Sequence, residues 1–262
     1  MQKLLEVKSL KKHFAVEKMM METKETVKAV DDISFFLEPG KILAIVGESG
    51  SGKTTAARCI AGLETPDSGK ILYSGAPIDY SDKKIRRKIQ YIFQDTYNSL
   101  NPRMRIFDII AEPLKFHFSL SGADLKSQVF QYLSRVNIAV SSADKYPHEL
   151  SGGQRQRAGI ARALTMRPSV LIADEPVSSL DVSIQAQILK LFTELNRGRG
   201  LGMIFITHDL RVVKNLADDI IIMKEGKIVE QGKVNGVYKR PKEDYTKLLL
   251  SSIPNSPYKF KV

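Results

Sequence analysis

The feature that most constrains the fold of this chain is the glycine-rich run GESGSGKT at residues 47–54. Residues 42–46, ILAIV, precede it and predict a buried strand, and residues 55–63 follow it and predict a helix. The pattern G-x-x-x-x-G-K-[ST] in this strand–loop–helix order is typical of a phosphate-binding loop. The alternative is a plain glycine-rich turn between two core elements. Such a turn requires neither the spacing G-x-x-x-x-G-K-[ST] nor a strand before it and a helix after it. The sequence therefore predicts that the chain binds a nucleoside triphosphate.

The chemistry of such a loop follows from its backbone and two of its side chains. Glycine adopts backbone angles closed to other residues, so successive N–H groups can converge on a phosphate chain, and the next helix adds the partial positive charge of its N-terminus. We expect Lys53 to reach the β- and γ-phosphates and the Thr54 hydroxyl to bind Mg²⁺. The residues expected to bind nucleotide here are Gly47, Ser49, Gly50, Ser51, Gly52, Lys53, Thr54 and Thr55.

Composition limits the class of protein. With 262 residues, 43% hydrophobic and 26% charged, the chain has an ordinary globular composition and can bury a sizeable core. The one cysteine, Cys59, excludes an internal disulfide framework and any cysteine-rich metal site. No run approaches the roughly 18 apolar residues of a transmembrane helix, and the N-terminus lacks the apolar block of a signal peptide. We therefore expect a protein of the cytosol or of the cytosolic side of a membrane.

The net charge of +11 makes nucleic acid or an anionic membrane surface a conceivable partner. The basic residues are scattered, however, in short clusters such as residues 11–12 and 83–88. The chain has no basic tail and no stripe of interleaved basic and aromatic residues of the kind that binds single strands. Solvated faces account for most of this charge, and we expect no nucleic-acid partner.

Along the chain, strand patterns and helix patterns occupy different regions. Residues 2–46 are rich in β-patterns, with strands expected at 4–8 and 32–37 and an exposed loop at 17–28. Residues 95–149 are mostly helical in pattern. We interpret that region as a helical insertion in an α/β core.

Polar residues follow three of the predicted strands. Asp174 and Glu175 come directly after an apolar strand, at the end where open α/β sheets bind ligands. Asp174 is expected to hold the Mg²⁺ shell and Glu175 to orient or deprotonate water, although two acids after a strand can also be plain surface residues. Gln94 ends a second strand and offers a neutral carboxamide to Mg²⁺ or water. His208 ends a third strand, where a single histidine is more often structural.

A second anion site is predicted at residues 150–154, LSGGQ, which open a helix that extends to residue 164. Ser151 is a good N-cap, and the following glycine pair exposes backbone N–H groups at the start of the helix. A flexible helix start is the alternative. Phe14, before the expected loop, could stack on an adenine ring or belong to the core, and the sequence leaves both readings open.

Together these motifs resemble the nucleotide-binding domain of ABC transporters, and the resemblance covers nearly the whole chain. It is carried by the phosphate loop, Gln94, residues 150–154, Asp174, Glu175, residues 179–181 and His208. It implies an α/β fold, namely a P-loop NTPase with a RecA-like core, an antiparallel β subdomain and an inserted helical subdomain. The implied single domain has its core and β subdomain at 1–94 and 161–235, the helical subdomain at 95–160, and a C-terminal helix and tail at 236–262.

The resemblance also implies ATP and Mg²⁺ as ligands and a head-to-tail dimer with a second ABC ATPase, either a copy of this chain or a homologue. Each ATP would then lie between the phosphate loop of one chain and residues 151–153 of the other. The head-to-tail orientation agrees with the presence of two anion-binding helix N-termini in one chain, because both cannot bind the same phosphates.

By position, the resemblance also assigns individual roles. Phe14 would stack on adenine, Gln94 would link the γ-phosphate to the helical lobe, and Glu175 would polarise the attacking water. His208 would contact the γ-phosphate, and Asp181 would signal across the dimer. The implied catalytic residues are Glu175, His208 and Gln94, the implied metal ligands are Thr54, Gln94 and Asp174, and the implied nucleotide residues outside the phosphate loop are Phe14, Ser151, Gly152, Gly153, Gln154 and Asp181.

Residues 98–103, 146–150 and 175–183 resemble the ATPases of dipeptide, oligopeptide and nickel importers. Such systems usually pair two ATPase chains with two transmembrane permeases and an external substrate-binding protein. The resemblance thus implies a hydrolysis-competent ATPase, peripheral on the cytoplasmic side of the membrane, which docks on permease loops through residues 94–110. Residues 241–249 resemble the start of that subfamily's C-terminal region, without the cysteine cluster of some relatives.

Peptide import is therefore the expected function, and nickel import is the alternative within the subfamily. A soluble ABC ATPase that acts on nucleic acid or ribosomes is the alternative from another class. Such proteins tend to carry two ATP cassettes in one chain or a long inserted arm, and neither is present here. A small-molecule kinase with a phosphate loop does not account for residues 150–154.

Overall fold

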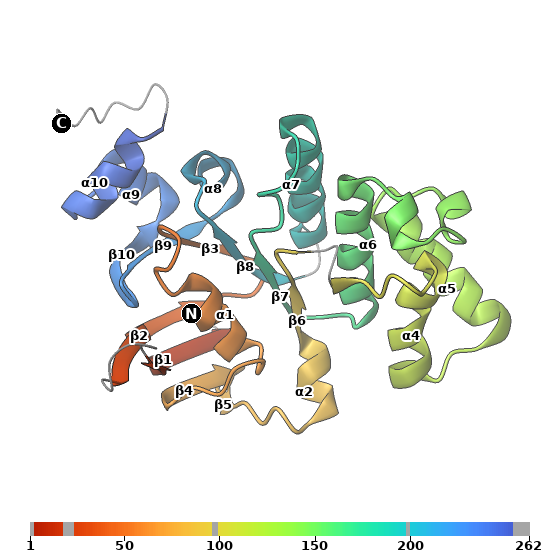
Figure 1. Ribbon diagram of the computed structural model, residues 1–262, viewed down its shortest axis with the longest axis horizontal. Coiled ribbons are helices and arrows are strands. Elements are labelled where there is room, and N and C mark those ends of the chain that lie inside the picture. Colours follow the sequence, from red (N-terminus) through yellow and green to blue (C-terminus); the bar gives the residue numbers. More distant parts are fainter. Residues whose placement is uncertain (1–2, 18–23, 96–98, 198–199, 254–262) are drawn as a thin grey trace.

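The computed structural model describes residues 3–17, 24–95, 99–197 and 200–253. Its elements form a six-stranded sheet, a four-stranded sheet and a set of helices that extends to one side (Figure 1). Parts of three expected segments lie outside the described residues: the loop at 17–28, the docking region at 94–110 and the tail at 236–262. Among the residues that the structure describes, no helix combines the length and the apolar character of a membrane span.

The six-stranded sheet has the order β10-β9-β3-β8-β7-β6. Strands β9, β3, β8, β7 and β6 are parallel neighbours, and β10 closes one edge as an antiparallel partner of β9. Every residue of β3, β7 and β8 is buried, as their unbroken apolar runs predict for a sheet covered on both faces. The strands are β3 (Ile42–Val46), β6 (Ile89–Ile92), β7 (Val170–Asp174), β8 (Gly202–Thr207), β9 (Asp219–Lys224) and β10 (Lys227–Lys233).

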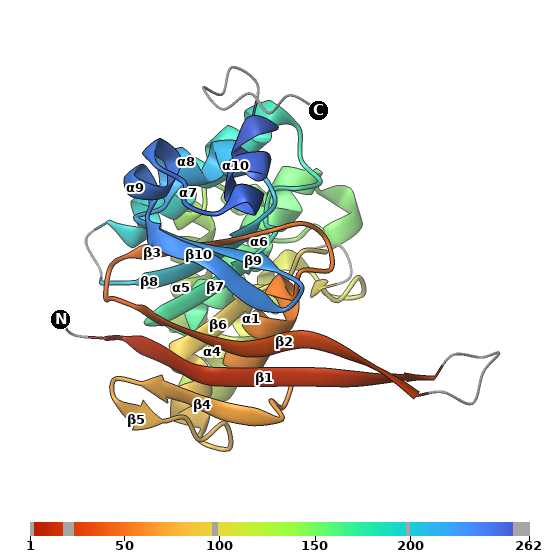
Figure 2. The ribbon, with the colours of Figure 1, turned by 90° about the vertical axis from the view of Figure 1, so that its left-hand side faces the viewer.

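The four-stranded antiparallel sheet has the order β2-β1-β4-β5 and forms a second layer. It comprises β1 (Leu5–Glu17), β2 (Lys24–Leu37), β4 (Ser68–Tyr73) and β5 (Ala76–Pro77). Strands β1 and β2 form a long hairpin that projects beyond the rest of the sheet (Figure 2).

The strands expected at 4–8 and 32–37 are therefore parts of longer strands. The prediction of a loop at 17–28 is wrong for residue 17 and residues 24–28, which lie in β1 and β2. The physical reason is irregular pairing. The register between β1 and β2 shifts three times between Val7 and Phe14, and Ser9 and Asp32 have positive φ angles of 46° and 61°. Such bulges interrupt the two-residue alternation on which strand prediction depends.

The helices cover both faces of the six-stranded sheet. Helix α1 lies between the two sheets, in a core shared by Leu43, Ile45 and Ile172 of the large sheet and Leu5 and Ile71 of the small one. The remaining core lies on the opposite face, under α6 and α7 and under α8 to α10. The helices are α1 (Lys53–Ile60), α2 (Lys83–Lys88), α4 (Ile106–Phe118), α5 (Gly122–Arg135), α6 (Gly152–Thr165), α7 (Val182–Asn196), α8 (Leu210–Leu216), α9 (Val234–Lys239) and α10 (Asp244–Ser251), with short 3-10 turns at Val140–Ser142 and Pro147–Glu149.

Helices α4, α5 and α6 pack together as a lobe beside β6 (Figure 1). Helices α4 and α5 confirm the predicted helical character of residues 95–149. Helix α6 crosses the expected boundary at residue 160 and continues to Thr165, and that boundary stays a prediction. At its start, Ser151 Oγ accepts the N–H of Gln154 at 3.3 Å and Gln154 Oε1 accepts the N–H of Ser151 at 3.1 Å, which confirms the predicted cap.

Candidate nucleotide-binding site

The phosphate loop joins β3 to α1, as the sequence predicts, but α1 begins at Lys53, two residues earlier than expected. Gly50 and Gly52 have φ angles of +81° and +98°, a region that favours glycine. A Cβ atom on Gly52 would lie 2.0 Å from the carbonyl oxygen of Ala29 in β2, and one on Gly47 would lie 2.2 Å from that of Met223 in β9. The loop therefore packs backbone against backbone on both neighbours, and a side chain at Gly47 or Gly52 would displace it.

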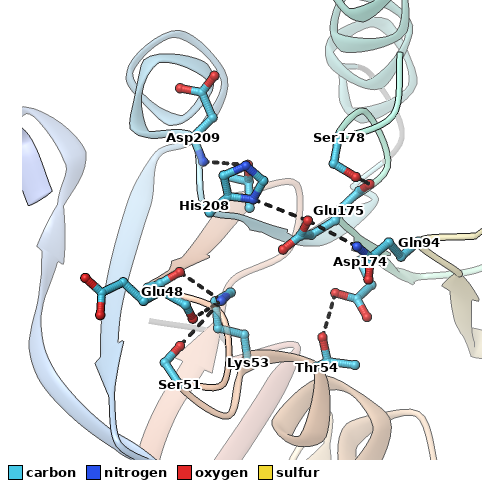
Figure 3. Close-up of polar contacts among 12 residues, drawn as sticks. Glu48, Ser51, Lys53, Thr54, Gln94, Asp174, Glu175, Ser178, His208 and Asp209 are labelled. Carbon is cyan, nitrogen blue, oxygen red and sulfur yellow. Dashed lines mark hydrogen bonds and ion pairs between the residues drawn. The ribbon is translucent and has the colours of Figure 1, made fainter. Parts of the chain in front are cut away.

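Lys53 is buried inside this loop, and its Nζ donates to the carbonyl oxygens of Gly47 at 2.8 Å and Glu48 at 2.7 Å (Figure 3). Burial lowers the pKa of Lys53, while the nearby carboxylates of Glu175 and Asp174 act in the opposite direction. Lys53 forms no ion pair within the described ranges. The loop thus holds a partly desolvated cation whose present acceptors, two carbonyl oxygens and the Ser51 hydroxyl at 3.4 Å, are all neutral, which suits it to an anionic ligand.

Asp174, at the end of β7, lies directly beside Thr54 (Figure 3). The Thr54 hydroxyl donates to Asp174 Oδ1 at 3.2 Å, and the Tyr91 hydroxyl donates to Asp174 Oδ2 at 2.6 Å. Burial raises the pKa of Asp174, and the hydrogen bonds from Tyr91 and Thr54 oppose that increase. Tyr91 was not among the predicted site residues because its contact with Asp174 depends on the pairing of β6 with β7. Once that pairing is known, the alternation of side chains between the two faces of each strand places Tyr91 and Asp174 on the same face of the sheet.

Glu175 lies at the centre of a second group of polar side chains. Its Oε2 accepts from Gln94 Nε2 at 3.3 Å and lies 3.3 Å from His208 Nδ1 (Figure 3). These three residues follow β6, β7 and β8, so the parallel sheet brings the three predicted catalytic candidates together. Glu175 has a φ of +43°, uncommon for a residue with a side chain, and its N–H donates to the carbonyl of Ile206 at 3.0 Å. The chain therefore turns sharply at Glu175, immediately after the strand.

A cleft of about 1130 Å³ lies over these groups. It is lined by nine predicted site residues, together with residues of β2 and two glutamates that the sequence analysis did not select. The predicted ones are Ser49, Gly50, Gly52, Lys53, Thr54, Thr55, Gln94, Glu175 and His208, and the others are Thr26, Val27, Lys28, Ala29, Glu48 and Glu225. The wall from β2 was missed because that segment was expected to be a loop.

Several predicted nucleotide residues do not line this cleft. Phe14 is exposed on β1, opposite Val27 of β2, and the ammonium group of Lys12 lies 5.1 Å from the centre of its ring. Phe14 therefore lies next to a residue of the cleft wall. Asp181 is the N-cap residue of α7, outside the cleft lining.

Residues 151–154 also lie outside the cleft lining, at the start of α6. A Cβ atom on Gly153 would lie 2.5 Å from Ile184 Cγ2, and one on Gly152 would lie 3.3 Å from Leu180 Cδ2. The glycine pair thus allows the start of α6 to pack closely on the start of α7. In a single chain the two predicted anion sites are separate.

The predicted metal ligands Thr54, Gln94 and Asp174 offer oxygen atoms, which suit Mg²⁺. Within the described ranges, no group of three or more His, Cys, Asp or Glu side chains could hold a metal by itself. This donor set fits an ion that is bound by one carboxylate together with the phosphates of a nucleotide, which is how Mg²⁺ is usually held.

Comparison with known proteins decides the family. Residues 30–178 match the family model described as ABC transporter. The chain belongs to the ABC transporter family. The dipeptide transport ATP-binding protein DppF of Escherichia coli (strain K12) is 45% identical over 257 residues, which cover 97% of this chain and 77% of that relative. The oligopeptide transport ATP-binding protein OppF of Bacillus subtilis (strain 168) is 48% identical over 259 residues, which cover 97% and 83%.

Solved ABC structures have the same fold. The dimeric post-hydrolysis structure of the ATP-binding cassette MJ0796, bound to ADP and Pi, has a TM-score of 0.78 at 29% identity and covers 88% of this chain and 98% of that one. CbiO1 from Clostridium perfringens, part of the ABC transporter complex cbiONQ, has a TM-score of 0.76 at 31% identity and covers 96% and 95%. These matches confirm the expected P-loop NTPase fold, and as an ABC family member the chain is an ATPase.

Proposed function

We propose that this chain is the ATP-hydrolysing subunit of an ABC importer that carries peptides across the cytoplasmic membrane. The observation that carries the proposal is that Lys53 and Glu175 line one cleft, with Asp174 hydrogen-bonded to Thr54 of the same cleft. The names of the relatives, which are dipeptide and oligopeptide transport ATP-binding proteins, support peptides as the transported class.

In this proposal each group of the cleft acts on ATP as substrate. Lys53 exchanges its loop carbonyls for oxygens of the β- and γ-phosphates, and backbone N–H groups of the loop donate to the same chain. Thr54, Gln94 and Asp174 hold Mg²⁺, which neutralises charge on the phosphates when bound. Glu175 orients the attacking water and accepts its proton, and the neighbouring His208 and Gln94 keep its carboxylate in place before contacting the γ-phosphate.

The complete site requires two chains in this proposal. Residues 151–154 form an anion-binding helix N-terminus that does not line the cleft of its own chain. They serve the ATP of a second ABC ATPase chain in a head-to-tail dimer, with Asp181 of the adjoining α7 N-terminus signalling between the chains. The dimeric state of the MJ0796 cassette supports this arrangement. Phe14, beside the cleft wall, stacks on the adenine.

The remaining partners follow from transport. Two transmembrane permeases bind the ATPase pair at the cytoplasmic face of the membrane, through the region of residues 94–110, and an external substrate-binding protein delivers the peptide. Closure of the dimer on ATP and its release after hydrolysis then drive the permeases. The permeases and the substrate-binding protein set the transported substrate, and nickel is the alternative cargo within the same subfamily.

Glu175→Gln tests the catalytic assignment, because the amide keeps the size of the side chain and cannot accept the proton. The turnover of ATP should fall about 10²–10⁴-fold, while ATP still binds. Steady-state ATPase assays and equilibrium binding of a fluorescent ATP analogue measure the two quantities. Glu194→Gln, the same change on the exposed face of α7, is the matched control and should leave both unchanged. If Glu175→Gln hydrolysed ATP at the wild-type rate, the assignment of Glu175 as the group that accepts the proton of water would be wrong.

Size-exclusion chromatography of Glu175→Gln with ATP tests the dimer, since ATP that is not hydrolysed should hold two chains together. A monomer at saturating ATP would argue against pairing of this chain with itself. ATPase activity stimulated by DNA or RNA in the absence of permeases would contradict the importer function. Reconstitution with its partner permeases, followed by uptake of labelled dipeptide or nickel, identifies the cargo.

A further inference from the structure

The Tyr91 hydroxyl makes a contact that neither the motifs nor the proposed function uses. Tyr91 is half-buried on β6, and its hydroxyl donates to Asp174 Oδ2 at 2.6 Å, within the range of a strong bond to a charged acceptor. Its ring lies 4.8 Å from the ring of Phe93, centre to centre, in a tilted arrangement. The phenol is therefore held in one orientation, with its oxygen on the carboxylate.

Strand pairing explains how Tyr91 reaches this acid. Tyr91 is paired with Ile172 in the parallel ladder between β6 and β7. Side chains two residues apart on a strand share one face, so Asp174 projects on the same face as Ile172, two residues further along β7. A phenol is long enough to cover that step, and a shorter side chain at position 91 would fall short of the carboxylate.

The two oxygens of Asp174 are thus shared between two donors. Thr54 donates to Oδ1 and Tyr91 donates to Oδ2, so the carboxylate cannot rotate without breaking one of these hydrogen bonds. The nearby positive charge of Arg58 also favours the ionised carboxylate. In the proposed function, Thr54 and Asp174 would both hold Mg²⁺, and Oδ1, the oxygen that contacts Thr54, would be the one available to the ion.

We propose that Tyr91 is a positioning residue of the metal site, which holds Asp174 by Oδ2 so that Oδ1 stays directed toward Thr54 and the bound metal. This inference rests on the proposed Mg²⁺ site. It differs from a purely structural role, in which the hydroxyl would only satisfy a half-buried polar group. Tyr80 is an example of that second role, because its hydroxyl donates to the backbone carbonyls of Ile60 at 2.7 Å and Cys59 at 3.2 Å.

Tyr91→Phe removes the hydroxyl and keeps the ring, and Tyr80→Phe is the matched control. Electron paramagnetic resonance with Mn²⁺ as the probe, in the presence of a non-hydrolysable ATP analogue, gives the metal dissociation constant without any turnover. We expect Tyr91→Phe to raise this constant about tenfold, the size of effect that follows from losing one charge-assisted hydrogen bond. The affinity for the same analogue in EDTA should stay at the wild-type value. Tyr80→Phe should lower the melting temperature and leave the Mn²⁺ constant unchanged.

Asp174→Asn separates a failure of this inference from a failure of the metal site itself. If Asp174→Asn binds Mn²⁺ as tightly as the wild type, the proposed metal site is wrong. If Asp174→Asn weakens Mn²⁺ binding and Tyr91→Phe does not, the positioning role alone is wrong. The double variant should bind Mn²⁺ no more weakly than Asp174→Asn, since the hydroxyl acts through the carboxylate.

A second substitution guards against a folding defect in Tyr91→Phe. Tyr91→Met also lacks the hydroxyl and fills the space with a more adaptable side chain. It should weaken Mn²⁺ binding to the same extent as Tyr91→Phe. A wild-type Mn²⁺ constant in the folded Met variant would overturn the proposal.

Discussion

Gly226 joins the phosphate loop to both sheets and offers a sharp test of how the loop is supported. It lies in the two-residue turn between β9 and β10, with a φ of +78°. Its N–H donates to the carbonyl oxygen of Ser51 at 3.1 Å, and its own carbonyl accepts the N–H of Asp31 at 2.8 Å. The turn therefore connects the loop to β9 and β10 on one side and to β2 on the other.

The substitution Gly226→Ala adds one methyl group at a place without room for it. A Cβ atom would lie 2.4 Å from the carbonyl oxygen of Lys28, and because that oxygen belongs to the backbone it cannot move aside alone. The left-handed conformation costs about 1–2 kcal/mol for a residue with a side chain. Displacing the turn also weakens the two backbone hydrogen bonds, each contributing about 0.5–1.5 kcal/mol. We expect the free energy of unfolding to fall by about 2–4 kcal/mol.

Gly75→Ala is the matched control, because Gly75 has a φ of +85° and nothing lies within 4 Å of the added Cβ. Its free energy of unfolding should fall only by the cost of the left-handed conformation, about 1–2 kcal/mol. Urea unfolding followed by circular dichroism measures the free energies, and a fluorescent ATP analogue measures nucleotide affinity. Gly226→Ala should weaken nucleotide binding through the displaced Ser51, whereas Gly75→Ala should not. Equal losses of stability in the two variants, together with unchanged nucleotide affinity, would refute this account of the loop.

Two further predictions concern the core and the C-terminal helix. Burial raises the pKa of the Cys59 thiol to about 11, so the thiol stays protonated at pH 8 and should react with a disulfide reagent only as fast as the protein unfolds; rapid reaction of the native protein would contradict its burial. Glu230 accepts the N–H groups of Lys242 at 3.0 Å and Glu243 at 3.2 Å, so Glu230→Ala should cost about 1–3 kcal/mol in urea unfolding and expose the α10 region to limited proteolysis. A wild-type digest pattern would show that other contacts anchor α10.

The features that the sequence predicted well are those that depend on neighbouring residues. The strand before the phosphate loop, the helix after it and the Ser151 cap are local patterns, and the structure confirms them. The meeting of Glu175 with His208 was predictable because parallel strands bring their carboxyl ends to one edge of a sheet.

The features that the sequence did not reveal depend on which strands pair and in what register. Tyr91 contacts Asp174 only because β6 is the neighbour of β7, and no local pattern states that order. Residues 26–29 line the cleft because β2 continues past several bulges that disrupt its alternation. Pairing energy arises between distant segments, so it leaves no short-range signal in the sequence.

The separation of Ser151 from the cleft of its own chain has a consequence for genetics. In a head-to-tail homodimer, a chain with a defective Lys53 and a chain with a defective Ser151 would combine into one doubly damaged site and one intact site. The two alleles would then complement each other, although each is inactive alone. If a homologous chain is the partner, each heterodimer contains one copy of this chain and therefore one allele. Every heterodimer then keeps one damaged site and one intact site, and co-expression of the two alleles restores no more activity than either allele alone. A cross between two loss-of-function alleles of one gene thus reports whether this chain pairs with itself.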